Sequence, residues 1–181
     1  MTLTESNYKL SKGDKAPDFN LLATDGKTYS PDNMEKKKAY LIVFMCNHCP
    51  YVQAKFYEIN RIAEDYKDDL LVIGINSNED EGYPEDSYEK MQEYVQKGKI
   101  KYLYLRDDSQ KIAKAYGAVC TPDPFLFDSD FNLVFHSRID DPPGTGPAKE
   151  HEMHKAIGEF LEKGEITMKE SPSMGCNIKW K

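Results

Sequence analysis

The stretch AYLIVFMCNHCPYV, residues 39 to 52, decides the fold of this chain. Its first half is continuously apolar and rich in β-formers, which is typical of a central strand covered on both faces. Cys46 and Cys49 follow with two residues between them, and Pro50 suits the first turn of a helix. The stretch therefore predicts a buried strand that ends at a cysteine pair, with a helix beginning near the second cysteine.

Strand and helix patterns alternate on both sides of this stretch. Continuous apolar runs predict strands at residues 39–45, 70–76 and, with an edge-like pattern, 101–107. Apolar periodicity and end signals predict helices at residues 51–66, 87–98, 110–117 and 151–164. Turn residues predict a loop at 140–147 and two hairpins, 18–22 with 27–30 and 124–129 with 132–140.

This order of elements is typical of an α/β fold. Strands that alternate with helices, then a hairpin and a last helix, predict a central mixed β-sheet flanked by helices, with an N-terminal β-hairpin extension. The right-handed crossover rule places the cysteine pair at the carboxyl edge of the sheet, where sites of α/β proteins usually lie. We expect one domain over residues 1–181, with 164–181 as an irregular tail.

Composition and charge narrow the classes of function. The chain has 181 residues, 39% of them hydrophobic, which is enough for the core of one compact domain. Its net charge is -7 and no predicted helix carries a basic stripe, which argues against nucleic acid or a membrane surface as a partner. The longest apolar run is too short to span a bilayer, and the first residues lack the apolar core of a signal peptide. We therefore expect a cytoplasmic protein.

The four cysteines are too few for a disulfide scaffold, so a close pair in the cytosol indicates catalysis or metal binding. At a helix N-terminus the unsatisfied amides favour a thiolate, and Cys46 is expected to be that thiolate. It would attack a substrate disulfide, and Cys49, one turn on and more buried, would displace the reduced product. His48 has two interpretations: an imidazolium that favours the Cys46 thiolate, or an exposed residue that fits the turn.

The segment VCTPDPF, residues 119 to 125, is a second candidate part of the site. If the Thr121-Pro122 bond is cis, it would present the backbone of Thr121 beside the cysteine pair, where an extended substrate segment pairs with it. The alternative is an ordinary trans proline that opens a strand. Because only about 5–6% of X-Pro bonds in folded proteins are cis, the residues alone leave both options open.

Together these segments resemble a known superfamily. A strand, C-x-x-C-P at a helix start, β-α units and a Thr-Pro before a hairpin are similar to the thioredoxin fold. GDKAPDFNLLATDGKTYS resembles the N-terminal extension of the peroxiredoxin (AhpC/TSA) and TlpA/ResA-like redoxin branches. FMCNHCPYV, INSNED, YPEDS, YLRDDSQ, AYGAVCTPD and PSMGCNIKWK resemble a bacterial group of thioredoxin-like proteins with a CNHC motif.

The resemblance assigns roles to individual residues. It implies that Cys46 is the attacking thiol, Cys49 the resolving thiol and Pro122 the cis-proline. Met45 stands where relatives usually carry tryptophan, so we expect it on an altered substrate-facing surface. The buried acid that thioredoxins carry on the preceding strand is missing here, which leaves the proton acceptor for Cys49 open.

The resulting prediction is a thiol-disulfide oxidoreductase in cell redox homeostasis that needs no bound cofactor or metal. Its substrate would be a disulfide-containing protein or a small thiol, and its reducing partner thioredoxin or a small thiol. The first alternative is a thiol-dependent, antioxidant peroxidase. That motif needs a Thr or Ser three residues before the cysteine and a Pro seven before, where Cys46 has Val43 and Ala39.

Two further cysteines, Cys120 and Cys176, are candidate auxiliary thiols. Cys120 precedes Thr121-Pro122 and would face the pair, whereas Cys176 lies in the tail, which would fold back over the site or pack on the surface. If both converge, a disulfide would pass from Cys46-Cys49 to Cys120 or Cys176, or Cys46, Cys49 and Cys120 would supply soft ligands for zinc together with a histidine or Cys176. A zinc or partner-binding module is therefore the second alternative; small buried thiols are the plain structural interpretation.

Overall fold

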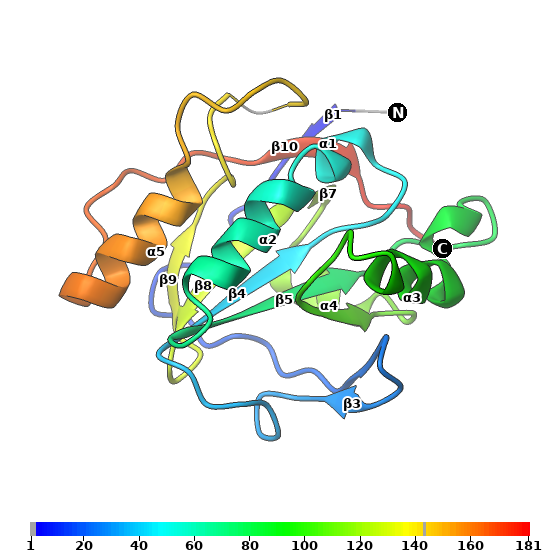
Figure 1. The fold of residues 1–181 in the computed structure, drawn as a ribbon, viewed down its shortest axis with the longest axis horizontal. Helices are drawn as coiled ribbons and strands as arrows, with labels where there is room; N and C mark the ends of the chain where they lie inside the picture. The colour runs from blue at the N-terminus through cyan, green and yellow to red at the C-terminus, as the bar shows by residue number, and fades with distance from the viewer. Residues whose placement is uncertain (1–2, 143) are drawn as a thin grey trace.

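The structure is a computed structural model that describes residues 3–142 and 144–181. Its centre is a mixed sheet of seven strands in the order β3-β2-β6-β5-β4-β8-β9 (Figure 1). The strands are β2 (Leu21–Ala23), β3 (Thr28–Tyr29), β4 (Ala39–Phe44), β5 (Leu70–Asn76), β6 (Leu103–Arg106), β8 (Asp123–Asp128) and β9 (Leu133–His136). β4, β5 and β6 are parallel, and the outer strands pair antiparallel, so the predicted α/β architecture with its N-terminal hairpin is confirmed.

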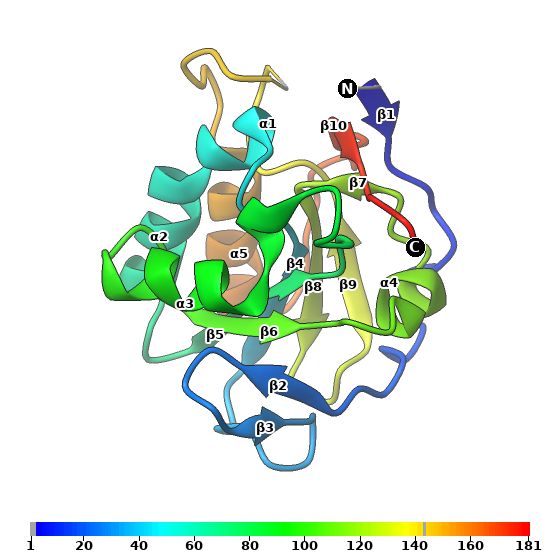
Figure 2. The ribbon, with the colours of Figure 1, turned by 90° about the vertical axis from the view of Figure 1, so that its right-hand side faces the viewer.

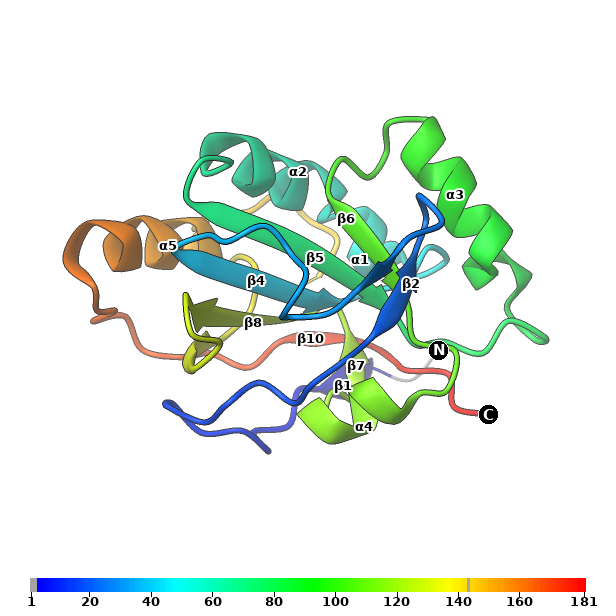
Figure 3. The same ribbon diagram turned by 90° about the horizontal axis from the view of Figure 1, so that it is seen from below.

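Helices cover both faces of this sheet. They are α1 (Pro50–Gln53), α2 (Phe56–Asp65), α3 (Tyr88–Gln96), α4 (Lys111–Tyr116) and α5 (Glu152–Lys163), with a 3₁₀ turn η1 (Pro84–Asp86). Seen from below, α2, α3 and α5 lie on one side of the sheet and α4 on the other (Figure 3). None of the described helices is long and apolar enough to cross a lipid bilayer.

The central strand β4 joins two hydrophobic cores. Successive side chains of a strand point to opposite faces, so every second residue enters the same core. Leu41 and Val43 pack in the core beneath α2, α3 and α5, whereas Ile42 and Phe44 pack with α4 and the N-terminal segment. All residues of β4 are fully buried, which explains its unbroken apolar sequence.

A second, three-stranded sheet brings the two ends of the chain together. Figure 2 shows β1 (Leu3–Glu5), β10 (Met174–Asn177) and β7 (Cys120–Thr121) side by side, and both pairings are antiparallel. The expectation of an irregular tail over 164–181 is therefore wrong for its middle part. These strands contain Gly175 and polar residues, so they show no alternating apolar pattern.

Two local predictions also need correction. β6 is an interior strand, because the N-terminal β2 pairs along its outer edge. The helix expected over 51–66 is two helices, α1 and α2, with a break at Ala54 and Lys55. Lys55 is almost fully buried there and forms an ion pair of 2.5 Å with Asp140. The apolar spacing continues across the break, which is why the sequence pattern indicates one helix.

Candidate functional site

The cysteine pair lies at the carboxyl end of β4, as predicted. Cys46 follows the strand by two residues, and Cys49 is the N-cap residue of α1, with Pro50 in the first turn. Neither cysteine has any solvent-exposed surface, so the expectation that Cys49 is the more buried of the two is wrong. None of the four cysteines, all of which lie in the described residues, forms a disulfide.

Three sulfur atoms and one threonine form a compact cluster. The Cys46 thiol lies 3.4 Å from the hydroxyl of Thr121, and the Cys49 thiol lies 3.7 Å from the backbone carbonyl of the same residue. The Thr121-Pro122 bond is cis, which decides between the two options left open by the sequence. On the other side of Cys49, its sulfur lies 2.6 Å from the sulfur of Cys176.

The two thiols of the pair have opposite acidities. A hydrogen bond from the Cys46 thiol, helped by donors from Cys176 and the amide of Val52, lowers the pKa of Cys49 to about 5. Burial raises the pKa of Cys46 well above its ordinary value, as do its bond to Cys49 and the nearby Asp86 carboxylate. The hydrogen bond between the two thiols therefore places the pKa of Cys49 below that of Cys46, the reverse of the expected assignment.

His48 is held by a buried carboxylate that the sequence pattern does not reveal. Its Nδ1 lies 2.5 Å from Asp86, whose side chain has no exposed surface. The ring also stacks on Tyr83 at 4.7 Å, and its Nε2 is buried without a partner among the described residues. His48 is thus fixed by a specific partner, rather than being an exposed residue of the turn.

Asp86 is the centre of a polar network around the cysteine loop. It accepts backbone bonds from Asn47 at 2.6 Å and His48 at 3.3 Å, and a side-chain bond from Asn78 at 2.8 Å. Burial acts to raise the pKa of Asp86, but the bonds from His48 and Asn78 outweigh it and leave the pKa lowered. Asp86 comes 38 residues after His48 in sequence, and no spacing rule connects the two.

The Asp86 carboxylate, the His48 ring and the Cys46 thiol also make a group that could hold a metal ion. Each has a ligand atom within 4.8 Å of the other two. This set differs from the predicted one, which combined Cys46 with Cys49 and Cys120. His48 and Asp86 already bond each other at Nδ1, so an ion at that nitrogen would have to replace this bond.

A second buried acid lies just beyond the cis-proline. Asp123 and His136 are almost fully buried and contact each other at 2.7 Å, but Asp123 Oδ2 and His136 Nδ1 have no partner among the described residues. Burial raises the pKa of Asp123, and the bond to His136 only partly offsets it. Cys120 is buried near this pair, and burial followed by the charge of Asp123 raises the pKa of its thiol.

All three residues expected to face substrate are buried in this structure. Met45 lies in the core, where its sulfur accepts a bond from Tyr102 at 3.2 Å, so its expected place on a substrate-facing surface is wrong. Thr121 is 2% exposed, because its backbone pairs with Cys176 of β10. Pro122 is also buried and borders a small hollow with Tyr51.

The positions that a peroxidase would use to bind a peroxide do not offer the groups for it in this structure. Val43 and Ala39 are part of the buried strand β4 and offer no hydroxyl to a peroxide. Arg138 is bound by Asp141 at 2.7 Å and by Glu152 at 2.6 Å. The guanidinium of Arg138 is therefore paired with two carboxylates.

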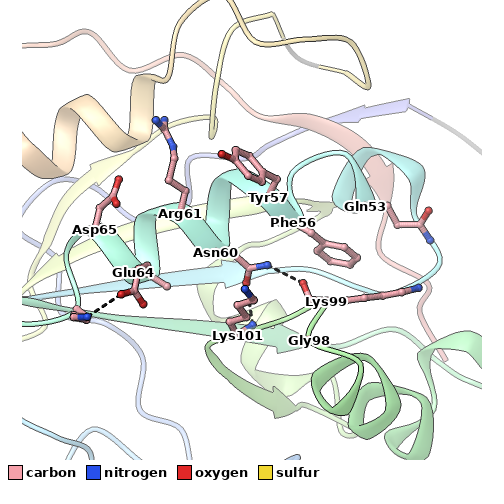
Figure 4. Close-up of a pocket in the computed structure, with 12 residues that line it drawn as sticks. Gln53, Phe56, Tyr57, Asn60, Arg61, Glu64, Asp65, Gly98, Lys99 and Lys101 are labelled. Atoms are coloured by element: carbon pink, nitrogen blue, oxygen red, sulfur yellow. Dashed lines mark hydrogen bonds and ion pairs between the residues drawn. The ribbon is translucent and has the colours of Figure 1, made fainter.

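A larger cavity lies on a different part of the surface. It has a volume of about 930 Å³ and lies between α2 and the loop before β6 (Figure 4). Exposed polar side chains border it, and Asn60 bonds the backbone of Lys99 at 2.9 Å across it. None of its lining residues is a cysteine.

Comparison with known proteins finds solved structures with a similar overall fold. A crystal structure of an uncharacterized conserved protein from Geobacillus kaustophilus shares 38% identity with a TM-score of 0.92, over 100% of this chain and 97% of that one. A hypothetical protein from Sinorhizobium meliloti 1021 shares 36% identity with a TM-score of 0.90, over 98% of both chains. A putative protein disulfide isomerase from Bacteroides thetaiotaomicron, at 20% identity and a TM-score of 0.68, covers 91% of this chain and 96% of its own.

The last of these likenesses is evidence of fold alone, and it confirms the thioredoxin-like fold expected from the sequence. No curated protein matches this chain significantly. The family model named Redoxin matches residues 11–157, which include the hairpin, the cysteine pair, the cis-proline and the first half of α5. Since that match covers most of the sequence, the chain belongs to the Redoxin family.

Proposed function

We propose that this protein is a thiol-disulfide oxidoreductase that works through a dithiol-disulfide cycle of Cys46 and Cys49. The observation that carries the proposal is that the sulfurs of both cysteines contact Thr121, at 3.4 Å and 3.7 Å, directly before the cis peptide bond to Pro122. Two unlinked cysteines with two residues between them are the reduced half of such a cycle. Membership of the Redoxin family supports a redox function of this general kind.

The acidities suggest how the proton moves. Cys46 attacks one sulfur of the substrate disulfide while the Cys49 thiolate accepts its proton, so Cys49 acts first as the base. The substrate S–S bond breaks, and one substrate sulfur leaves as a thiolate. That thiolate takes the proton back from Cys49, and Cys49 then attacks Cys46 and releases the second substrate sulfur as a thiolate. The products are the Cys46-Cys49 disulfide, one substrate thiol and one substrate thiolate, so charge and electrons balance.

This sequence of steps supplies the proton acceptor that β4 lacks. The substrate is a disulfide in a protein or small molecule, and the oxidised pair is reduced by thioredoxin or a small thiol in the cytoplasm. Because Cys46 has no exposed surface, a segment that covers it must move before a protein disulfide can reach it.

Insulin reduction with dithiothreitol as the electron source tests the proposal. The wild-type protein should accelerate precipitation of the insulin B chain well above the rate with dithiothreitol alone. Cys46→Ser should abolish the acceleration, because no attacking sulfur remains. Cys120→Ser is the matched control, since it removes a buried thiol outside the exchanging pair. A Cys46→Ser protein as active as the wild type would refute the mechanism.

A further inference from the structure

The C-terminal strand β10 occupies the backbone edge beside the cis-proline. Cys176 stands directly opposite Thr121 in the antiparallel ladder, and Asn177 stands opposite Cys120. This is the edge at which an extended substrate segment would add as a strand. The chain therefore places its own strand, with a cysteine in it, at the position expected for a substrate.

Several contacts fix the register of this strand. A Cβ atom on Gly175 would lie 1.9 Å from the carbonyl oxygen of Thr121, so glycine permits the close approach of β10 to β7. Beyond Cys176, the Ile178 amide bonds Val119 at 3.0 Å and the Lys179 amide bonds Asn78 at 2.9 Å. Cys176 is 1% exposed, and these contacts before and after it in the chain hold its sulfur 2.6 Å from the sulfur of Cys49.

We propose that Cys176 is a third redox residue, which exchanges with the Cys46-Cys49 disulfide to form a Cys49-Cys176 disulfide. This inference rests on the proposed dithiol cycle and adds a step to it. The Cys176 sulfur attacks the sulfur of Cys49, the Cys46-Cys49 bond breaks, and Cys46 leaves with the proton that Cys176 gives up. One disulfide replaces another, so no external oxidant or reductant is consumed.

The charge on Cys49 in the reduced and oxidised states agrees with an exchange that forms the Cys49-Cys176 disulfide. In the reduced protein burial, and then the bond and charge of Cys49, raise the pKa of Cys176 to about 12. When Cys49 is oxidised it carries no charge, so one cause of this high pKa disappears in the state in which Cys176 must react. The exchange returns Cys46 to the thiol form while the protein remains oxidised.

Thiol counting in a Cys46→Ser variant tests the step in isolation. The variant retains Cys49, Cys120 and Cys176, and is oxidised with glutathione disulfide, then denatured and alkylated with a mass-tagged maleimide. We expect one tagged thiol, Cys120, and a linked pair of peptides that contain Cys49 and Cys176. Three tagged thiols, under conditions that fully oxidise the wild type, would overturn the proposal.

Matched variants separate this inference from the proposed function. Cys46→Ser/Cys176→Ser should form no disulfide between two protein cysteines, so Cys120 is tagged and Cys49 is either tagged or bound to glutathione. A linked Cys49-Cys120 pair would show that Cys120 is the third redox residue and refute the proposal. Cys46→Ala, a smaller replacement, repeats the test if serine disturbs folding. If the wild type forms Cys46-Cys49 and reduces insulin while Cys46→Ser forms no bond, only the inference fails. If the wild type neither forms that bond nor reduces insulin, the proposed function itself fails.

Discussion

Two buried aspartate-histidine pairs flank the cysteine cluster, and they differ in how completely they are bonded. Asp86 bonds His48 and also accepts from Asn47 and Asn78, whereas Asp123 bonds only His136 among the described residues. The pKa of Asp86 is accordingly lowered and that of Asp123 is raised. Hydrogen bonds, rather than depth of burial alone, decide which buried carboxyl group stays ionised.

The difference has a functional consequence. Asp86 accepts bonds from the backbone of the loop between the two cysteines. Its charge also raises the pKa of Cys46, although burial and the bond to Cys49 are larger causes of that rise. Asp123 instead acts on Cys120, because after burial its charge is the next cause that raises the pKa of that thiol. The Asp86 pair therefore acts on the exchanging cysteines, and the Asp123 pair on an auxiliary cysteine.

Removal of the Asp86 carboxylate should have the largest effect on stability. Asp86→Ala leaves the donors of Asn47, His48 and Asn78 buried without an acceptor. We expect a loss of about 3–5 kcal/mol in the free energy of unfolding, measured by urea denaturation. As a control, Asp80→Ala removes a carboxylate that is 36% exposed in its side chain and lies 3.5 Å from Arg106, and should cost less than about 1 kcal/mol. Equal losses in both variants would contradict the central role of Asp86.

The same carboxylate should make the wild-type protein sensitive to acid. Because the pKa of Asp86 is lower in the folded than in the unfolded state, its contribution is present above the unfolded pKa of about 4 and is lost as the pH falls through the folded value. The wild type should therefore lose its advantage over Asp86→Ala below about pH 4. A difference in stability between the two proteins that stays constant down to pH 2 would contradict the lowered pKa of Asp86.

Asp123→Asn should have a smaller effect of the opposite sign. The folded-state pKa of Asp123 is raised, so the wild type loses stability as the pH rises from about 4 through that folded value. The amide does not titrate. The free energy of unfolding of the variant, relative to that of the wild type, should therefore rise by up to about 1.4 kcal/mol for each pH unit between the unfolded and the folded pKa of the carboxyl. Urea unfolding at pH 4 and pH 7 measures the gain. A variant that weakens relative to the wild type over this range would show that Asp123 is ionised.

Asp86→Asn should have the smallest effect, on the acidity of Cys46. The amide retains an oxygen acceptor but removes the negative charge that raises the pKa of Cys46. In a Cys49→Ser background, the pH midpoint of iodoacetamide labelling at Cys46 should fall by up to about one pH unit, which corresponds to about 1.4 kcal/mol. Asp123→Asn in the same background is the control and should leave the midpoint unchanged. A midpoint that rises in Asp86→Asn would reverse the assigned electrostatic effect.

The parts of the site that follow from local pattern could be predicted from the sequence. The apolar run before Cys46, the helix start at Pro50 and the Thr121-Pro122 motif each depend on neighbouring residues, and the structure places all three as expected in one site. Cys176 could be foreseen only as one of two alternatives, since a tail that folds back depends on long-range pairing.

Asp86 could not be predicted for a related reason. It is one of many acidic residues in an acidic chain, and only the tertiary fold shows that it is buried under Asn47 and His48. The reversed acidity of Cys46 and Cys49 has the same origin. The donors that lower the pKa of Cys49 include Cys176, which is 127 residues away in sequence.

Disulfide mapping of the oxidised wild-type protein tests the role of the cysteine pair most directly. After mild oxidation, alkylation at low pH and proteolysis, mass spectrometry should find a Cys46-Cys49 linkage in part of the molecules and a Cys49-Cys176 linkage in the rest, with Cys120 alkylated throughout. Oxidised protein in which Cys46 and Cys49 are both alkylated would contradict a dithiol cycle at this site.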